Sequence, residues 1–300
     1  MFLCSESLCS EPRASARATS RDAADFRQAT DPATVPNDVL QLRPAFTIVE
    51  LLVVGGIVAL LVGLLLPGLA AARAQTRETV CRSNLRQLLI ANDLYATENG
   101  GYYVPGAADF LENLHRWHGV RDRIDEPFDP ARGPLAPYLG PDAQVRQCPS
   151  FPVKEITSPT GGFERGSGGY GYNNRYLGVQ LSCGADGSCV TTNDRTGAAV
   201  RWVARPQRTV MFTDSAFVAG GLIEYGFAEP RFHPSYPTSR ATPSIHFRHR
   251  GRAEVGWCDG HIDAQTMTFT WKGPFYEGDP GRYHIGWFGE HDDNRLFDLD

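Results

Sequence analysis

The chain contains 300 residues, of which 42% are hydrophobic and 21% are charged, so it can bury the core of one or two domains. Its net charge at pH 7 is −5 and it has no basic tail, which argues against a nucleic-acid-binding protein. None of its seven cysteines forms a C-x-x-C pair, so a zinc ribbon or a thioredoxin-like site is not supported.

Residues 1–45 are rich in Ser, Ala, Arg and Asp and show no periodic apolar face. Such a segment cannot bury enough apolar surface to fold, so it is predicted to be disordered. It is interpreted either as a long leader or as an extension that arises from a start codon placed too far upstream. In both cases we expect residues 1–45 to be absent from the mature protein.

An apolar run follows, and from Leu51 to Leu66 it contains no charged or strongly polar side chain. With its flanks the segment of low polarity exceeds 20 residues, and a helix needs about 20 residues to cross a bilayer. A buried core helix would be shorter and less uniformly apolar. A signal peptide has an apolar region of about 7–15 residues and then a cleavage site, whereas charged, helix-forming sequence follows here. The run therefore predicts a single membrane span.

The start of this run contains Ala45, Phe46 and, four positions further on, Glu50. A lone carboxylate at mid-helix in lipid costs about 2.5–3.5 kcal/mol on insertion scales, and less near a helix end. The stretch Phe46–Leu52 resembles the leader junction of type IV prepilins and type II secretion pseudopilins. In that family a peptidase cuts on the cytoplasmic side before a residue that is commonly Phe. The family's glutamate is the fifth mature residue, as Glu50 is when Phe46 is counted first.

The resemblance implies several properties of this chain. Prepilin peptidase would cut between Ala45 and Phe46, and the new amine of Phe46 would be methylated. The family usually has Gly before the cut, so Ala45 predicts slower processing. In a filament Glu50 would pair with the amine of a neighbouring pilin-like subunit, whereas the alternative is an ordinary carboxylate at a helix start. The protein is expected to cross the inner membrane once, with its head in the periplasm or, after assembly, outside the cell.

Beyond Pro67 the sequence becomes amphipathic. Side chains recur three and four positions apart and define one face of a helix. The positions on this face are Cys81, Leu85, Leu88, Asn92 and Tyr95. Asn99-Gly100-Gly101 then stops the helix. Residues 46–99 are therefore predicted to form a helix whose first half lies in the membrane and whose second half packs on a globular head.

Residues 100–300 are predicted to form that head. Gly and Pro punctuate short segments here, and residues 109–123 are expected to hold a short helix. Strands are predicted at 199–204, 209–218, 252–258 and 261–271. The predicted fold class is therefore α+β and pilin-like, with the long N-terminal helix packed on an antiparallel β-sheet head that has long loops.

The last two predicted strands are separated by Asp259 and Gly260, the pair preferred in a two-residue type I′ turn, so a tight hairpin is predicted. Strand alternation would then place Cys258 opposite His261. His249, nine further residues and Asp259-Gly260 also resemble a motif near the C-terminus of many prepilin-type proteins. That large group is called processing-associated, and the motif has no agreed biochemical role.

A metal site is one interpretation of this segment, because His246, His249, Asp259 and His261 are residue types that bind zinc. In the other interpretation Asp259 shapes the turn and the histidines bond Asp259 or the backbone. We favour this structural interpretation, since the sequence shows no second ligand set, and we predict no metal or other cofactor. The acidic end, residues 290–300, lacks calcium-ligand spacing and is expected to be a solvated tail.

Two pairs of cysteines invite comparison. Cys183 and Cys189 flank a five-residue, Gly-rich loop and are well placed for a local disulfide in an oxidising compartment. Cys81 and Cys148 would join the helix to the head if they paired, which the sequence alone does not establish. The pairing of Cys258 stays open as well.

Three functions follow from these patterns. The first is a pilin- or pseudopilin-like structural subunit, processed by prepilin peptidase and assembled into a pilus or pseudopilus. The second is a membrane-anchored binding module that never polymerises. The third, an enzyme such as a metal hydrolase, has no nucleophile elbow, phosphate-binding glycine loop or H-E-x-x-H motif in its favour. Glu50 favours the structural subunit, since an anchor alone needs no carboxylate.

Overall fold

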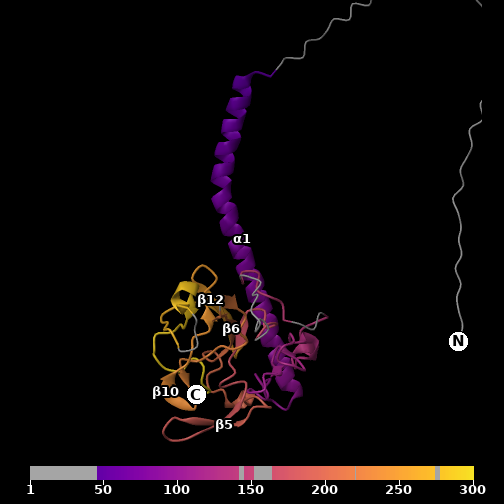
Figure 1. Ribbon diagram of the computed structural model, residues 1–300, viewed down its shortest axis with the longest axis vertical. Coiled ribbons are helices and arrows are strands. Elements are labelled where there is room, and N and C mark those ends of the chain that lie inside the picture. Colours follow the sequence, from indigo (N-terminus) through magenta and orange to yellow (C-terminus); the bar gives the residue numbers. More distant parts are fainter. Residues whose placement is uncertain (1–45, 142–144, 152–163, 220, 274–277) are drawn as a thin grey trace, which may run out of the picture. The chain divides into compact units, whose positions relative to one another are not determined.

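The computed structural model describes residues 46–141, 145–151, 164–219, 221–273 and 278–300 (Figure 1). The helices are α1 (Ile48–Glu98) and the short 3-10 helices η1 (Pro130–Arg132), η2 (Ala136–Tyr138), η3 (Val200–Trp202) and η4 (Pro280–Tyr283). The strands of the first half of the head are β1 (His115–Arg116), β2 (Gly119–Val120), β3 (Tyr170–Tyr172), β4 (Gln180–Cys183), β5 (Cys189–Asn193) and β6 (Val210–Asp214). The later strands are β7 (Phe217–Val218), β8 (Leu222–Ile223), β9 (Phe232–His233), β10 (Tyr236–Arg240), β11 (Ile245–His246), β12 (Arg252–Trp257), β13 (Ile262–Thr266) and β14 (Ile285–Gly286).

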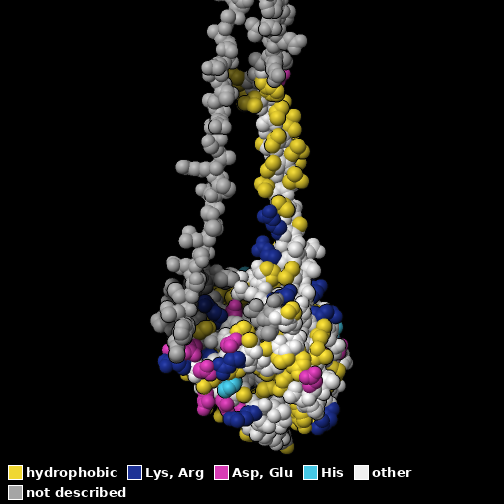
Figure 2. All heavy atoms as spheres, turned by 90° about the vertical axis from the view of Figure 1, so that its right-hand side faces the viewer, with side chains coloured by type: hydrophobic (Ala, Val, Ile, Leu, Met, Phe, Trp, Pro, Cys, Tyr) yellow, Lys and Arg dark blue, Asp and Glu magenta, His cyan; other side chains and the backbone are white. Residues whose placement is uncertain are grey.

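The first half of α1 is a candidate membrane span. An 18-residue window of this helix reaches a mean hydropathy of 2.8, and none of it is buried. Figure 2 shows hydrophobic side chains on this part of α1 and basic side chains where the apolar run ends. The helix is therefore long and apolar enough for the predicted single-pass membrane protein.

The second half of α1 packs against the head (Figure 1). Cys81, Leu85, Leu88 and Asn92 are buried there, and Tyr95 is half-buried. The helical period in the sequence therefore identified the packed face of α1 correctly.

α1 ends in a Schellman motif. Gly100 has a φ of +67°, and the Gly101 N–H donates to the Ala96 carbonyl at 2.8 Å. Glycine adopts this left-handed backbone without steric cost, which explains why Asn99-Gly100-Gly101 ends the helix.

A four-stranded antiparallel sheet lies at the centre of the head, with the strand order β13-β12-β6-β3. β12 pairs with β13 on one side and with β6 on the other. The strand predicted at 252–258 is β12, and the one predicted at 261–271 is its neighbour β13, which ends earlier than predicted, at Thr266. The coarse α+β prediction, with one long helix and an antiparallel sheet, is confirmed.

Alternation along β12 gives its two faces different partners. Glu254 and Gly256 face α1, and a Cβ on Gly256 would lie 2.9 Å from Leu89 Cδ1. Glycine at this position lets the helix approach the sheet closely. The alternate residues of β12 belong to a second core cluster, which also includes the C-terminal segment. These residues are Ala253, Val255 and Trp257.

The C-terminal segment belongs to that cluster, so the prediction of a solvated acidic tail is wrong. Phe297 is only 2% exposed. Asp292 accepts two hydrogen bonds from Arg240 at 2.8 and 2.7 Å and lies 3.3 Å from Arg231. The apolar side chains between the acidic residues anchor the segment, and arginines of the head neutralise Asp292.

Two further predictions are wrong. Residues 109–123 form turns and the short strands β1 and β2 instead of a helix, and Asp109 and Asn113 have φ of +55° and +53°. These left-handed residues interrupt a helix. Residues 199–204 form η3 instead of a strand, because a short apolar run does not specify its own period.

Candidate functional site

Glu50 completes a capping box at the start of α1. Thr47 donates its backbone N–H and its hydroxyl to Glu50 Oε2, at 2.9 and 2.8 Å, and the Thr47 hydroxyl accepts the Glu50 N–H at 3.2 Å. Phe46, the expected mature N-terminus, is 75% exposed, and Ala45 lies outside the described residues. In this single chain Glu50 therefore has the geometry of a helix-start carboxylate.

The spacing between His249 and Asp259 has a structural explanation. The intervening residues are a two-residue turn, the six residues of β12, and Cys258. His249 and Asp259 therefore lie at opposite ends of one strand, roughly 20 Å apart at about 3.3 Å per residue. The motif describes a strand with its two turns, and its residues do not form a cluster.

The type I′ turn lies before β12. Arg250 and Gly251 have φ of +55° and +79°. His249 and Arg252 exchange two backbone hydrogen bonds across this turn, at 2.9 and 3.1 Å. Positive φ at both central residues is what a type I′ turn requires.

The turn after β12 has three loop residues, so the prediction of a two-residue type I′ turn at Asp259-Gly260 is wrong. Gly260 has a φ of +87° and donates its N–H to the Trp257 carbonyl at 2.9 Å. The Trp257 N–H in turn donates to the His261 carbonyl at 3.0 Å. This is the pattern of a turn followed by one left-handed residue in a bulge.

The extra loop residue changes the residue that faces His261. Trp257, and not Cys258, lies opposite His261, and their rings stack with centroids 5.6 Å apart. A shift of one residue moves a side chain to the other face of the strand, and Cys258 is accordingly buried. Asp259 Oδ1 accepts the His261 N–H at 3.1 Å and lies 2.6 Å from His261 Nδ1, so Asp259 does shape this turn.

His249 contacts neither Asp259 nor its turn; it lies where the sheet meets α1. It is 3% exposed, and its Nε2 lies 3.3 Å from Asp214 Oδ2 and 3.6 Å from Cys148 Sγ. A disulfide joins Cys148 to Cys81 of α1. The motif histidine therefore packs against the covalent link between helix and head.

The metal site considered from the sequence does not assemble. His249 and His261 lie at opposite ends of β12, and His246 packs edge-on against Phe151. A group within ligand distance in the described part of the chain is Cys81, Cys148 and His249. Its two sulfurs are bonded to each other, and metals bind thiolates instead of disulfide sulfurs.

Charged side chains align α1 with β12. Arg82 donates Nε and Nη2 to the two carboxylate oxygens of Glu254, at 3.0 and 2.9 Å, and Arg252 donates to Glu78 at 2.9 Å. The Glu254 side chain is fully buried, whereas that of Arg82 is 45% exposed. Arg82 therefore compensates a charge that would otherwise be buried alone.

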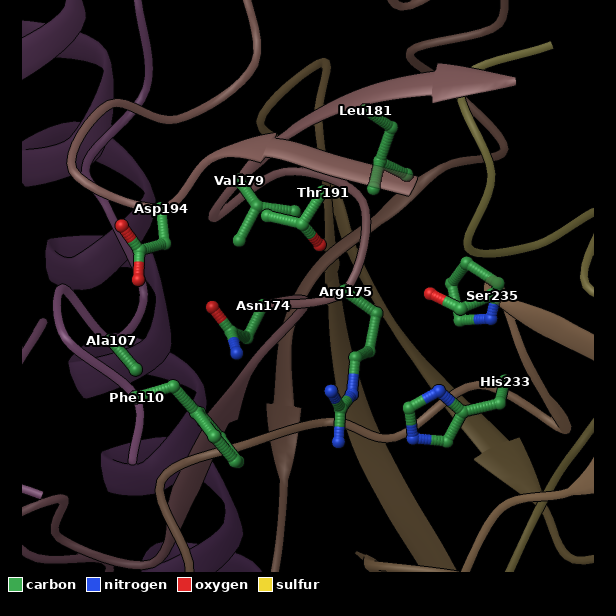
Figure 3. A pocket seen from close by; sticks show the side chains of 11 residues that line it. Ala107, Phe110, Asn174, Arg175, Val179, Leu181, Thr191, Asp194, His233 and Ser235 are labelled. Atoms are coloured by element: carbon green, nitrogen blue, oxygen red, sulfur yellow. The ribbon is translucent and has the colours of Figure 1, made fainter. Parts of the chain in front are cut away.

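The second disulfide joins Cys183 and Cys189, which pair across the β4–β5 hairpin. This hairpin forms one wall of a pocket of about 230 Å³ (Figure 3). The opposite wall is the turn between β9 and β10. The floor is formed by Asn174 and Arg175, which come directly after β3 in the sequence. The polar and aromatic residues that line the pocket include Phe110, Asn174, Arg175, Thr191, His233 and Ser235.

Arg175 is the central charge of this pocket. Its Nε donates to Glu229 at 3.1 Å, and its guanidinium carbon lies 5.3 Å from the centre of the Phe110 ring. Burial disfavours the charged form, but the Glu229 carboxylate outweighs burial and raises the pKa of Arg175. Burial and the Arg175 charge lower the pKa of His233, so its imidazole is neutral at neutral pH. The pocket thus presents one fixed, compensated cation beside a neutral histidine.

Comparisons of the chain with protein-family models, curated proteins and solved structures found no match. What this chain does is therefore inferred from its own residues.

Sequence patterns had not singled out Asp214 or the pocket. Asp214 gives one signal, a carboxylate inside the apolar segment 209–218. The pocket residues come from separate segments that no spacing pattern connects, so only the fold brings them together.

Proposed function

We propose that this protein is a pilin- or pseudopilin-like structural subunit that prepilin peptidase processes before Phe46 and that assembles through its N-terminal helix. Glu50 carries the proposal, because it is the fifth residue from Phe46 and stands at the start of an apolar helix. A carboxylate in lipid is costly unless it is paired, and the amine of a neighbouring subunit would pair it. The inner membrane, with the head in the periplasm, is the proposed location, and the two disulfides suit that oxidising compartment.

The attachment of α1 to the head supports a structural role. A subunit of a filament must transmit forces from its packed helix to its head, whereas a flexible tether is enough for an anchored binding module. Here three contacts fix the helix to the head: the disulfide between Cys81 and Cys148, the bidentate ion pair of Arg82 with Glu254, and the packing of Leu89 on Gly256. The proposed role of the His249 motif is likewise structural, since it brackets the strand that contacts α1.

Mass spectrometry of the protein extracted from native membranes tests the proposal. We expect the chain to begin at Phe46 and to carry a methyl group on the new amine. The variant Ala45→Gly should be cut at the same bond, and Ala45→Asp should not, because the residue before the cut is small in this family. An intact Met1, or a cut after Ala72 as in a secretory signal peptide, would contradict the proposal.

A further inference from the structure

The pocket beside the β4–β5 hairpin has room for one small ring. Its volume is about 230 Å³, whereas sites for drug-sized ligands span about 300–1,000 Å³. Leu181 and Pro234 contribute apolar wall, and polar side chains supply much of the remaining lining. The backbone N–H of Cys189 donates to the Pro234 carbonyl at 2.9 Å and ties the two walls together. The pocket is therefore formed before any ligand arrives.

Polar atoms with unused hydrogen-bonding capacity line this pocket. Arg175 uses its Nε on Glu229, and no hydrogen bond joins its two Nη groups to any described residue. Figure 3 shows the Asn174 amide nitrogen on the pocket side, and no hydrogen bond joins it to any described residue. Figure 3 shows the hydroxyls of Thr191 and Ser235 turned toward the middle of the pocket. These atoms match a ligand that both donates and accepts.

The Asn174 side chain is held in place by two glycines. A Cβ on Gly106 would overlap Asn174 Oδ1, and a Cβ on Gly178 would lie 2.6 Å from the same atom. The two glycines therefore leave just enough room for the amide. This packing turns Oδ1 away from the pocket and leaves the amide nitrogen, Nδ2, on the pocket side (Figure 3).

The charges around the pocket favour a neutral ligand. Glu229 compensates Arg175, and Asp194 adds a carboxylate to the lining. An anion would approach Asp194 and an arginine that is already paired, and a cation would approach the Arg175 guanidinium. His233 lines the pocket as a neutral imidazole and adds no charge.

We propose that this pocket binds one neutral sugar ring of a glycan, whose hydroxyls hydrogen-bond Arg175, the Asn174 amide nitrogen and the Thr191 and Ser235 hydroxyls. Sugar hydroxyls both donate and accept, so one ring accepts from the Arg175 Nη groups and Asn174 Nδ2 and also donates to the two side-chain hydroxyls. Leu181 and Pro234 would cover the C–H surface of the ring. This binding activity is separate from filament assembly and does not depend on it.

Saturation-transfer NMR on the full chain tests the proposal, in a detergent without a sugar head group so that the detergent cannot compete. The probes are glucose, galactose, mannose and N-acetylglucosamine, with glucuronate and acetate as anions. We expect transfer to the ring protons of at least one neutral sugar. The double variant Thr191→Val/Ser235→Ala should weaken that binding roughly tenfold through lost hydrogen bonds. Thr238→Val/Ser239→Ala makes the same changes on exposed positions of β10 and should leave it unchanged.

Three results would overturn the sugar site. The first is no transfer to any of the four neutral sugars. The second is equal affinity in the two double variants, which would place the binding elsewhere. The third is transfer to glucuronate or acetate alone, which would identify an anion site on Arg175. Because Thr191 and Ser235 are not buried, these variants leave the core intact and the test does not depend on a folding defect.

Discussion

Nε2 of His249 lies 3.6 Å from the sulfur of Cys148. Cys148 is the head's half of the disulfide to Cys81 of α1, so the motif histidine packs on the bond that joins helix and head. The same nitrogen lies 3.3 Å from the Asp214 carboxylate at the end of β6. The motif histidine and the helix attachment are therefore one structural unit.

Removing the Cys81–Cys148 disulfide should destabilise the head more than removing Cys183–Cys189. The two bonds join cysteines 67 and 6 positions apart in the sequence. In the chain-entropy model the disulfide that closes the longer loop stabilises the folded state by about 4 kcal/mol, and the one that closes the shorter loop by about 2 kcal/mol. Denaturant unfolding of the two double Ser variants measures both losses.

Alkylation without reduction provides the control for that comparison. All four cysteines should resist labelling in protein recovered from the cell envelope. Cys258 should label only after unfolding, because burial makes it inaccessible and raises the pKa of its thiol. Free labelling of both Cys183 and Cys189 before reduction would contradict the hairpin disulfide.

The ion pair between α1 and β12 should be important because one partner is fully buried. Arg82→Met leaves the Glu254 carboxylate in the interior without its two hydrogen bonds. Loss of one partner of a buried pair costs about 3–5 kcal/mol, and less here because Arg82 is 45% exposed. We therefore expect a loss of about 2–3 kcal/mol in the free energy of unfolding. Arg86→Met, on an exposed position one turn further along α1, is the matched control and should cost much less.

The hairpin loop should respond to its backbone geometry. Gly260→Val places a β-branched residue at a φ of +87°. We expect the free energy of unfolding to fall by about 1–2 kcal/mol, because a left-handed backbone is costly for such a residue. A Cβ there meets no atom within 4 Å, so the loss has no packing component. Gly260→Asn, which tolerates this conformation better, should lose less, and Tm measured on both variants tests the order. Equal Tm values for Val and Asn would remove the backbone argument.

The sequence predicted the elements that have a strong period. The apolar run and the packed face of α1 were evident because residues three and four apart share a helix face, and β12 was evident from alternation. The position of His249 was not evident, since Cys148 lies 101 residues away and no local pattern records such a contact. The length of the hairpin loop was not evident, since Asp-Gly fits both a two-residue turn and a three-residue loop whose last residue, Gly260, has positive φ. The pocket required the fold, since it joins segments between Ala107 and Ser235.

Acid should destabilise the head through His246. Burial, and then the charge of Arg248, lowers the pKa of His246 to about 2, so the folded protein holds it neutral. The unfolded chain takes up a proton at the ordinary pKa near 6.5, so this stabilisation is present above that pH and is lost as the pH falls toward 2. The free energy of unfolding should therefore be about 2 kcal/mol lower at pH 5 than at pH 7.

The variant His246→Gln isolates that effect. Glutamine does not titrate, so the Tm of the variant should fall less than that of the unchanged protein between pH 7 and pH 5. Every other titratable group is the same in both proteins, so the difference between their pH profiles reports His246. Parallel profiles would contradict the prediction.

Glu50 has two possible roles that a single substitution separates. In this chain its carboxylate forms a capping box with Thr47, and a capping box accepts either Glu or Gln at that position. Pairing with the amine of a neighbouring subunit, however, requires the negative charge. Glu50→Gln should therefore preserve the start of α1, membrane insertion and cleavage before Phe46, while removing most of the sedimentable filaments.

Thr47→Val is the matched variant, because it removes the hydroxyl of the cap and keeps the charge of Glu50. We expect it to assemble at near-normal yield. Loss of the cap should lower the stability of the first helical turn by about 0.5–2 kcal/mol. Pelleting and cross-linking of both variants from the same membranes measure the two yields. If Glu50→Gln assembles normally and Thr47→Val does not, the carboxylate serves as a helix cap and the pairing mechanism is wrong. If both fail, assembly depends on the geometry of the first turn as well as on its charge.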